Sequence, residues 1–397
     1  MNKIGYLLSQ YPFPRHSYIG AEIDAVRERG ITVAAISIRP GVWSPDEMTE
    51  RERADAALTH YLLTSFWHVV RAFLAVSLQR PIGCMRALGC ALRYGHGRLQ
   101  RTLSGFFYVG EAAAAGRHFL AKGVGHVHSH YTSTVAWMMA EIFPELEISL
   151  SIHGSAEFID PWFCLRQKIR KAKSVRVISE TGARLLRKVA DPRDWHKIAI
   201  YRLGVEVPTL EPKPGYHGGS FTLLFVGGTD CPRTLDITLE ALKVLLQADR
   251  DVRLIIVGDG KNQVVLRSLA QSLGVSERVN FSGWKNQEQL RPFYAAADAM
   301  IFSSSNEGIP VALMEAMSYG IPCVASNVGA INELIVDGES GILVRPGDCQ
   351  AIVSAVAHLI DDACLARWIG SAAHIQISEK YDARINLSDF ATFLARD

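Results

Sequence analysis

Acidic residues are missing from a long stretch in the first half of this chain. From Ala56 to Gly110 there is no aspartate or glutamate, although the segment holds six arginines. The 397 residues carry a net charge of +2, so this +6 segment leaves −4 for the rest. The same segment also holds aromatic residues, among them Trp67, Phe73 and Phe106. This pattern suits a surface that meets an anionic membrane, and it equally suits ordinary core helices with solvated arginines.

Paired cysteines, an export signal and a membrane span are also missing. The seven cysteines are scattered without a CxxC pair, which favours reduced thiols over disulfides or a zinc site. The first apolar run, Ile4–Leu8, is too short for a signal peptide. The uncharged window Gly123–Ala140 contains three histidines and makes a poor span. We expect a cytoplasmic protein that can attach peripherally to the inner face of the cell membrane.

The chain opens with a pattern that predicts a parallel sheet. A strand-like run at Ile4–Leu8 and a polar loop precede a helical pattern over Tyr18–Arg29. Gly30 ends this helix, and the run Ile31–Ile38 is rich in β-branched residues. Strand, helix and strand in this order form a βαβ unit.

A second βα-repeating domain is expected after a linker at residues 208–220, which holds three prolines and three glycines. Strands are predicted at Phe221–Val226 and Ala299–Phe302, with a helix at Asp236–Ala248 between them. We therefore expect domains at 1–207 and 221–374, and a helix over 375–397. Two such domains on one linker make a cleft, which is the usual ligand site in open α/β sheets.

The segment from Glu307 to Glu315 reads as a loop followed by a helix N-terminus. Gly308 would let a ligand approach the backbone, Ile309 follows it, and Pro310 suits the first helical position. At the helix N-terminus Pro310–Ala312, the free N–H groups of Val311 and Ala312 would form a site for phosphate. Glu315 would lie about 7–8 Å further along the helix, where a carboxylate can accept from a ribose diol. The alternative is an ordinary strand–loop–helix with Glu315 solvated.

This block resembles the E-x7-E signature of glycosyltransferase family 4, whose members retain the anomeric configuration. The flanking segments Tyr294–Asp298, Glu315–Ala325 and Gly341–Asp348 are similar to the family as well. The resemblance implies the GT-B fold, in which two Rossmann-like parallel-sheet domains face each other across a cleft. It implies that the N-terminal domain binds the acceptor and the C-terminal domain the nucleotide sugar. It also implies that the last helix crosses back to the N-terminal domain.

The phosphate loop departs from the family pattern. After the strand at Phe221–Val226 the family usually has Gly-Arg, and five residues later Lys-Gly, whose basic groups hold the diphosphate. Here these positions are Gly228 and Arg233-Thr234. Arg233 can still clamp phosphate, whereas the loss at Gly228 removes a contact of roughly 1.5–3 kcal/mol. The other interpretation of Arg233 is a solvated loop charge.

Other resemblances fall in the first half. Ser151-Ile152-His153-Gly154 resembles the family's His-Gly, so His153 and Glu307 are the candidate catalytic residues. Arg15, His16 and Ser17 are candidates for acceptor or donor contacts, although the glycines common in this loop are missing. His126, His128 and His130 alternate as strand residues on one face would. No cysteine or acid is close to them in sequence, and the family needs no catalytic metal, so we expect no metal site.

The resemblance implies transfer of a sugar from a UDP- or GDP-linked donor to an acceptor hydroxyl on a saccharide or lipid-linked acceptor. The branch it is similar to assembles bacterial cell-surface polysaccharide or glycolipid. No cofactor beyond the nucleotide-sugar substrate and no nucleic acid partner is expected. The alternatives are a catalytically weak or silent GT-B protein that binds sugar nucleotides, which the loss at Gly228 favours, and a GT-B epimerase. The donor, acceptor and linkage do not follow from the sequence.

Overall fold

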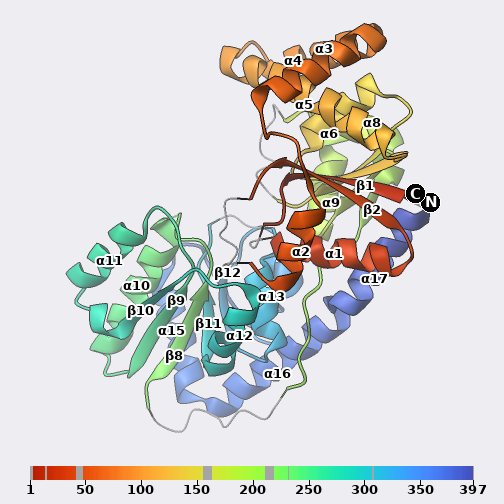
Figure 1. The fold of residues 1–397 in the computed structure, drawn as a ribbon. Helices are drawn as coiled ribbons and strands as arrows, with labels where there is room; N and C mark the ends of the chain where they lie inside the picture. Colours follow the sequence, from red (N-terminus) through yellow and green to blue (C-terminus); the bar gives the residue numbers. More distant parts are fainter. Residues whose placement is uncertain are drawn as a thin grey trace. The chain divides into compact units, whose positions relative to one another are not determined.

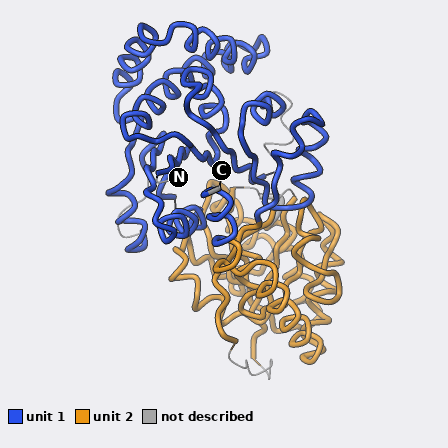
Figure 2. Tube along the Cα trace, turned by 90° about the vertical axis from the view of Figure 1, so that its right-hand side faces the viewer, with its two compact units in different colours: residues 1–201, 387–397 blue, residues 202–386 orange. Residues whose placement is uncertain are grey.

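The computed structural model describes residues 3–13, 16–41, 48–154, 163–210, 219–230, 232–305 and 308–396. The chain forms two compact units (Figure 2). Each unit has its own sheet. Unit 1 comprises residues 1–201 and 387–397, and unit 2 comprises residues 202–386. The last eleven residues therefore belong with unit 1 although the preceding helices belong with unit 2.

Unit 1 is built on a parallel seven-stranded sheet in the order β3-β2-β1-β4-β5-β6-β7. The order reverses between β1 and β4, which makes this pair the switch point of the sheet. Its strands are β1 (Lys3–Gln10), β2 (Thr32–Arg39), β3 (His60–Tyr61), β4 (His126–His130), β5 (Glu147–Ile152), β6 (Ser174–Val177) and β7 (Ile198–Ile200).

Helices cover the sheet of unit 1, and α3 and α4 extend from it together with α5 (Figure 1). In Figure 1, α3 and α4 lie beyond α5 and α6 as seen from the strands. The helices are α1 (Ser17–Glu28), α2 (Glu50–Leu58), α3 (Phe66–Gln79), α4 (Pro81–Gly95), α5 (Leu99–Ala121), α6 (Ser133–Ile142), α8 (Leu165–Lys171) and α9 (Glu180–Val189). The helices expected within 56–110 are thus α3, α4 and the start of α5.

Unit 2 repeats the design with a parallel six-stranded sheet in the order β10-β9-β8-β11-β12-β13. Its switch point lies between β8 and β11. The strands are β8 (Phe221–Val226), β9 (Val252–Val257), β10 (Val279–Gly283), β11 (Ala299–Phe302), β12 (Cys323–Ser326) and β13 (Ile342–Val344). The helices between them are α10 (Pro232–Gln247), α11 (Gln263–Ser272), α12 (Gln287–Ala296), α13 (Val311–Ser318) and α14 (Ile331–Leu334).

The C-terminal segment is three helices, α15 (Cys349–Asp361), α16 (Ala363–Lys380) and α17 (Ala383–Arg396). The single helix expected over 375–397 is wrong, because the chain breaks at Tyr381-Asp382. Asp382 pairs with Val205 in a short bridge, and Gly204 leaves room there, since a Cβ would lie 2.4 Å from the Cα of Ala383. Within the described ranges, no single helix meets the length and hydropathy needed to cross a bilayer; α15 with α16 meets them only as a pair bent by 106°.

Each sheet buries an apolar core of its own. Ile148, Leu150 and Val175 lie in the core of unit 1, and Leu223, Leu254 and Ile301 in that of unit 2. Strands buried on both faces read as continuous apolar runs, which is why the sequence predicts them well. The expectation of an α/β protein with two parallel sheets is confirmed.

Candidate functional site

Two helix N-termini face the switch point of unit 2. Strands β8 and β11 are neighbours, and α10 and α13 follow them in the chain. The Thr238 hydroxyl of α10 and the Ser303 hydroxyl after β11 lie 2.8 Å apart, so the two strand–helix connections are joined. Ligands of open α/β sheets bind at this place, and helix N-termini favour anionic groups.

The structure places part of the predicted donor residues here. Gly228 lies in the loop after β8, and Gly308 and Ile309 lie in the loop before α13. Pro310 precedes the helix as its N-cap, so its predicted place as the first helical residue is wrong by one position. Arg233 belongs to the first turn of α10 rather than to a loop, although its side chain is outside the described part, as is all of Glu307.

The loop beside Gly228 is held by close backbone packing. Gly227 donates a backbone hydrogen bond to Val257, and Thr229 donates one to Asp259. At Gly258, which has φ of 144°, a Cβ would lie 1.9 Å from the Gly227 oxygen. Only glycine fits such a conformation at this distance, so the first two βα loops of unit 2 form one packed layer.

Glu315 is buried, so the alternative with a solvated Glu315 is wrong. Its side chain on α13 is 9% exposed. The Tyr294 hydroxyl donates a hydrogen bond of 2.8 Å to one carboxylate oxygen, and the Gln287 amide donates one of 3.2 Å to the other. Burial raises the pKa of Glu315 to about 7, against the effect of these two donors. Each oxygen keeps a lone pair for a further donor such as a ribose hydroxyl.

A pocket of about 90 Å³ adjoins Glu315. Its other walls come from α12 and from the segment after Gly204, where Glu206 forms an ion pair of 2.9 Å with Arg291. The aromatic rings of Tyr294 and Tyr319 stack on one side. Glu315 therefore borders a solvent-connected space while being fixed by two neighbours.

A buried polar cluster occupies the switch point of unit 1. His153, after β5, has its Nε2 atom 2.8 Å from Nδ1 of His130. The Nε2 atom of His130 lies 2.9 Å from the Glu22 carboxylate on α1. Arg176 of β6 forms an ion pair with the other oxygen of Glu22. We call these four residues the His153 relay.

The charge of Glu22 fixes the direction of its hydrogen bond with His130. Although burial raises the pKa of Glu22, attraction to His130 and Arg176 outweighs it and lowers that pKa. Burial lowers the pKa of His153 well below its ordinary value, and His130 and Arg176 add to the effect. An ionised Glu22 only accepts, so His130 donates to it from Nε2. When His130 is neutral, its Nδ1 accepts from Nε2 of His153, and Nδ1 of a neutral His153 is then an acceptor.

The other alternating histidines bind serines of the neighbouring strand. His128 lies 2.8 Å from the Ser149 hydroxyl and 2.9 Å from that of Ser151, and His126 lies 2.8 Å from Ser149. Potential metal-ligand atoms of Glu22, His128 and His130 lie within 4.8 Å of one another. The sequence near the histidines contains no acidic residue, but the fold brings Glu22 of α1 beside them. Arg176 already neutralises Glu22 there, and the expectation of no metal stays a prediction.

Aromatic rings cover His153 at the carboxyl end of β4. Tyr131 stacks on His153 with ring centroids 4.8 Å apart and stacks on His16 at 4.6 Å. Its hydroxyl lies 2.6 Å from that of Tyr18. The structure thus brings the predicted His16 beside His153, while Ser17 begins α1 and offers its carbonyl to Arg51. Arg15 lies outside the described residues.

Glu22, Arg176 and Tyr131 are parts of this site that the sequence reasoning missed. Glu22 lies on the apolar face of its helix beside Ile19 and Ile23, and an acid in that place is a usable signal. Arg176 likewise interrupts a buried strand. The partners of both are distant in sequence, and only the folded sheet brings them together.

Comparisons with known proteins find glycosyltransferases. Residues 207–375 match the family described as Glycosyl transferases group 1. The amylovoran biosynthesis glycosyltransferase AmsK of Erwinia amylovora is 24% identical over 413 residues, covering 99% of both chains. The lipopolysaccharide core biosynthesis glycosyltransferase LpsE of Rhizobium meliloti is 35% identical over 123 residues, 31% of this chain and 36% of that protein.

Among solved structures, HepE of Anabaena in complex with UDP-glucose has a TM-score of 0.74 at 17% identity, covering 100% of both chains. Residues 207–375 therefore belong to the group 1 glycosyltransferases, glycosyltransferase family 4, and the chain is similar over its full length to a glycosyltransferase of bacterial polysaccharide synthesis. It is a glycosyltransferase with the GT-B fold and is related to glycosyltransferases of bacterial surface polysaccharides.

Proposed function

We propose that this enzyme moves a sugar from a UDP- or GDP-linked donor to an acceptor hydroxyl and retains the anomeric configuration. The product is a bacterial surface polysaccharide or glycolipid. The observation that carries the proposal is the E-x7-E block at the N-terminus of α13, on the switch point of unit 2. The complex of HepE with UDP-glucose makes UDP-sugars the first donors to test.

In this proposal, unit 2 holds the nucleotide diphosphate. The N-terminus of α13 and Arg233 meet the charge that develops on the leaving diphosphate, which stabilises the transition state. Glu307 contacts the sugar, and Glu315 accepts from the ribose hydroxyls. Gly228 supplies no cation, so Arg233 carries the whole side-chain contribution expected from this loop.

The His153 relay serves the same reaction from unit 1. Nδ1 of His153 accepts a hydrogen bond from a hydroxyl of the donor sugar, and His130 and Glu22 hold the ring in the required tautomer. Because His153 stays neutral in its buried place, it positions the sugar and does not act as a charged acid. The leaving phosphate takes the proton of the acceptor hydroxyl.

Donor turnover with a panel of UDP- and GDP-sugars tests the proposal, with hydrolysis and transfer both measured. Glu307→Ala and His153→Ala should each lower the rate more than tenfold, on the order of 1.4 kcal/mol or more. Arg233→Ala should also lower the rate. Lys243, ten residues beyond Arg233 on α10, provides the control variant Lys243→Ala. Nucleotide-sugar binding without turnover would instead support the silent alternative. Near-normal activity of both first variants would contradict the assigned site.

We also propose that the enzyme works at the cytoplasmic face of the membrane through α3 and α4. These helices expose large apolar side chains, including Trp67 at 65% and Leu78 at 87%. Arg71, Arg86 and Arg93 are exposed on the same pair of helices, whereas Arg80 is engaged by Glu145. Exposed apolar residues among cations suit the interface of an anionic bilayer.

Co-sedimentation with vesicles tests the membrane contact. Phosphatidylglycerol vesicles should bind the enzyme, and phosphatidylcholine vesicles should bind it much less. Trp67→Ser with Leu78→Ser should reduce binding at least tenfold, whereas Val264→Ser on α11, equally exposed at 75%, should leave it unchanged. Binding that does not depend on anionic lipid would overturn this part.

A further inference from the structure

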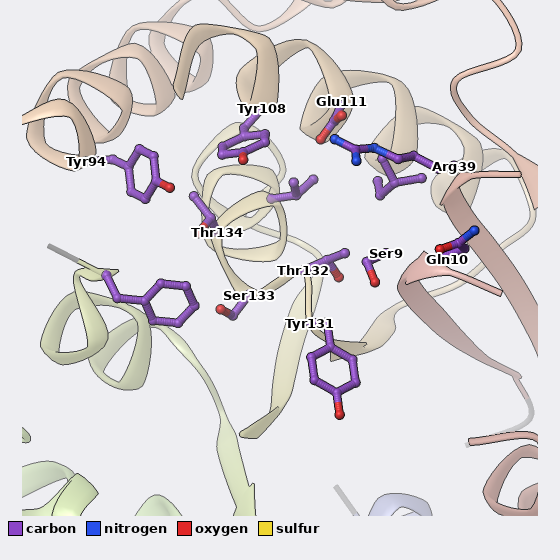
Figure 3. Close-up of a pocket in the computed structure, with 13 residues that line it drawn as sticks. Ser9, Gln10, Arg39, Tyr94, Tyr108, Glu111, Tyr131, Thr132, Ser133 and Thr134 are labelled. Carbon is purple, nitrogen blue, oxygen red and sulfur yellow. The ribbon is translucent and has the colours of Figure 1, made fainter. Parts of the chain in front are cut away.

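A cavity of about 300 Å³ opens in unit 1 at the carboxyl ends of β1, β2 and β4 (Figure 3). Aromatic side chains come to it from α4 and α5, at Tyr94 and Tyr108, and Phe163 lies on a further wall. Glu111 of α5 lines it beside Arg39 at the end of β2. We call it the Glu111 pocket. Its volume is at the lower end of ligand sites, which are roughly 300–1,000 Å³.

Glu111 is an unpartnered carboxyl group in this cavity. It is 2% exposed, and within the described part of the chain it makes no hydrogen bond or ion pair. Burial raises its pKa to about 7, and Arg39 opposes this only at a distance. Figure 3 shows the two side chains turned toward one another. A buried polar group left without a partner is costly, and a ligand that donates a hydrogen bond would remove this cost.

The hydroxyls opposite Glu111 are arranged to donate. Lys168 is fully buried behind the pocket, and its Nζ donates to Ser133 at 3.2 Å and to Thr134 at 2.8 Å. Because both hydroxyl oxygens accept from Lys168, their hydrogens can point toward a ligand. Both residues line the Glu111 pocket at the N-terminus of α6.

The lining selects for a neutral, hydroxyl-rich ligand. Glu111 disfavours an anion, and Arg39 with the buried Lys168 disfavours a cation. A sugar hydroxyl both donates and accepts, so neighbouring hydroxyls of one ring can satisfy Glu111 and Arg39 together. The aromatic rings would cover the apolar faces of that ring.

The Glu111 pocket shares a wall with the His153 relay. Tyr131 lines the pocket and stacks on His153. It adopts φ of 59°, which a tyrosine rarely takes, and the hydroxyl of Tyr18 holds its ring in place. A ligand in the pocket would therefore lie next to the ring that covers His153.

We propose that the Glu111 pocket binds one neutral sugar residue of the acceptor, with Glu111 accepting from one hydroxyl and Arg39 donating to its neighbour. This inference rests on the proposed glycosyl transfer and names the acceptor class. α4 and α5 carry both this pocket and part of the exposed apolar surface, which fits a sugar attached to a lipid carrier.

Binding of methyl glycosides to the full-length enzyme tests the pocket directly. The panel contains the methyl glycosides of glucose, galactose, mannose and N-acetylglucosamine. Saturation-transfer NMR measures their binding. The wild-type enzyme should bind at least one. Glu111→Leu and Arg39→Met should each weaken that binding at least tenfold, whereas Glu147→Gln, a surface carboxylate paired with Lys173, should not.

Two further measurements separate the possible failures. Glu111→Leu removes an unpartnered carboxyl, so its thermal midpoint should not fall, and lost binding cannot then be assigned to unfolding. Donor turnover of the wild-type enzyme is measured alongside; if the wild-type enzyme turns over no donor, the proposed function fails instead. Binding of no glycoside by the wild-type enzyme, or equal binding by Glu111→Leu, would overturn the pocket.

Discussion

At the scale of single residues, the most demanding feature is the buried ion pair of Glu22 and Arg176. Both side chains are at most 1% exposed. Glu22 accepts from Tyr6 at 3.1 Å and from His130, so the carboxylate has hydrogen-bond donors around it. Arg176 also donates to the Tyr201 carbonyl and lies 3.9 Å above the ring of Phe390. The pair therefore joins β6, α1 and the C-terminal helix within unit 1.

Removing both partners should cost less stability than the sum of the two single removals. Glu22→Gln or Arg176→Met leaves a buried charge without its counter-ion, with an expected loss of about 3–5 kcal/mol in the free energy of unfolding. The double variant should lose less than the sum of the two. Urea unfolding of the four proteins measures this coupling, and additive effects would contradict it.

Glu111 makes the stability depend on pH in an unusual direction. Its pKa is about 7 in the folded protein against an ordinary 4.5, so the folded state keeps a proton that the unfolded state releases. This contribution to stability is present below about pH 4.5 and is lost as the pH rises through about 7. Glu111→Gln should therefore be more stable than the wild-type enzyme at about pH 8, by on the order of 3 kcal/mol.

The same comparison at about pH 4 should show almost no difference, because Glu111 is then protonated in both states. Unfolding in urea at the two pH values measures the change, with Glu147→Gln as the control. His153 acts in the opposite sense: its lowered pKa costs stability as the pH falls below about 6.5. An equal effect of Glu111→Gln at both pH values would contradict the unpartnered carboxyl.

Short sequence patterns single out some of the candidate residues, whose roles stay predictions. His153 and Glu315 stand in local motifs, and the structure buries both residues. Glu111 has no motif; it stands in an alanine-rich helix, and its place in a cavity depends on β1, β2 and β4. Residues that acquire their role from distant segments are beyond sequence patterns.

At the scale of elements, strand positions were predicted closely and helix limits less so. β8 and β11 have the predicted limits, because buried parallel strands are short apolar runs between turn residues. α10 begins at Pro232, four residues before the predicted Asp236, since proline suits a first turn that the apolar pattern does not reveal. The break before α17 follows from the Asp382 bridge, a tertiary contact.

The loop layer of unit 2 should be intolerant of any side chain at Gly258. Gly258→Ala places a Cβ against the Gly227 carbonyl, and it also forces alanine into a glycine conformation. We expect a loss of more than 2 kcal/mol and weaker nucleotide-sugar binding, because the phosphate loop must move. Thermal unfolding and calorimetric titration with UDP measure the two effects.

Gly274→Ala is the matched control, since Gly274 also has positive φ, at 74°, but a Cβ there meets nothing within 4 Å. It should cost only about 1 kcal/mol, the strain of the backbone alone. Equal losses in the two variants would show that backbone strain, rather than contact with Gly227, dominates at Gly258.

At the scale of the whole molecule, two separate cores imply that each unit has its own free energy of unfolding. The core of unit 1 and that of unit 2 share no strand, and each sheet has its own switch point. The nucleotide is proposed to bind unit 2, whereas the His153 relay and the Glu111 pocket belong to unit 1. A ligand stabilises only the folded state that binds it, so UDP should act unequally on the two cores.

Hydrogen exchange with UDP at about one hundred times its dissociation constant should show this difference. The amides of β8, β9 and β11 that exchange by full opening should slow by up to about a hundredfold, or about 2.7 kcal/mol, while those of β5 and β6 should change little. Glu315→Ala should reduce the effect, because it removes the proposed partner of the ribose. Equal protection of both sheets would mean that the units unfold as one cooperative body, and protection of β5 and β6 alone would place the nucleotide in unit 1.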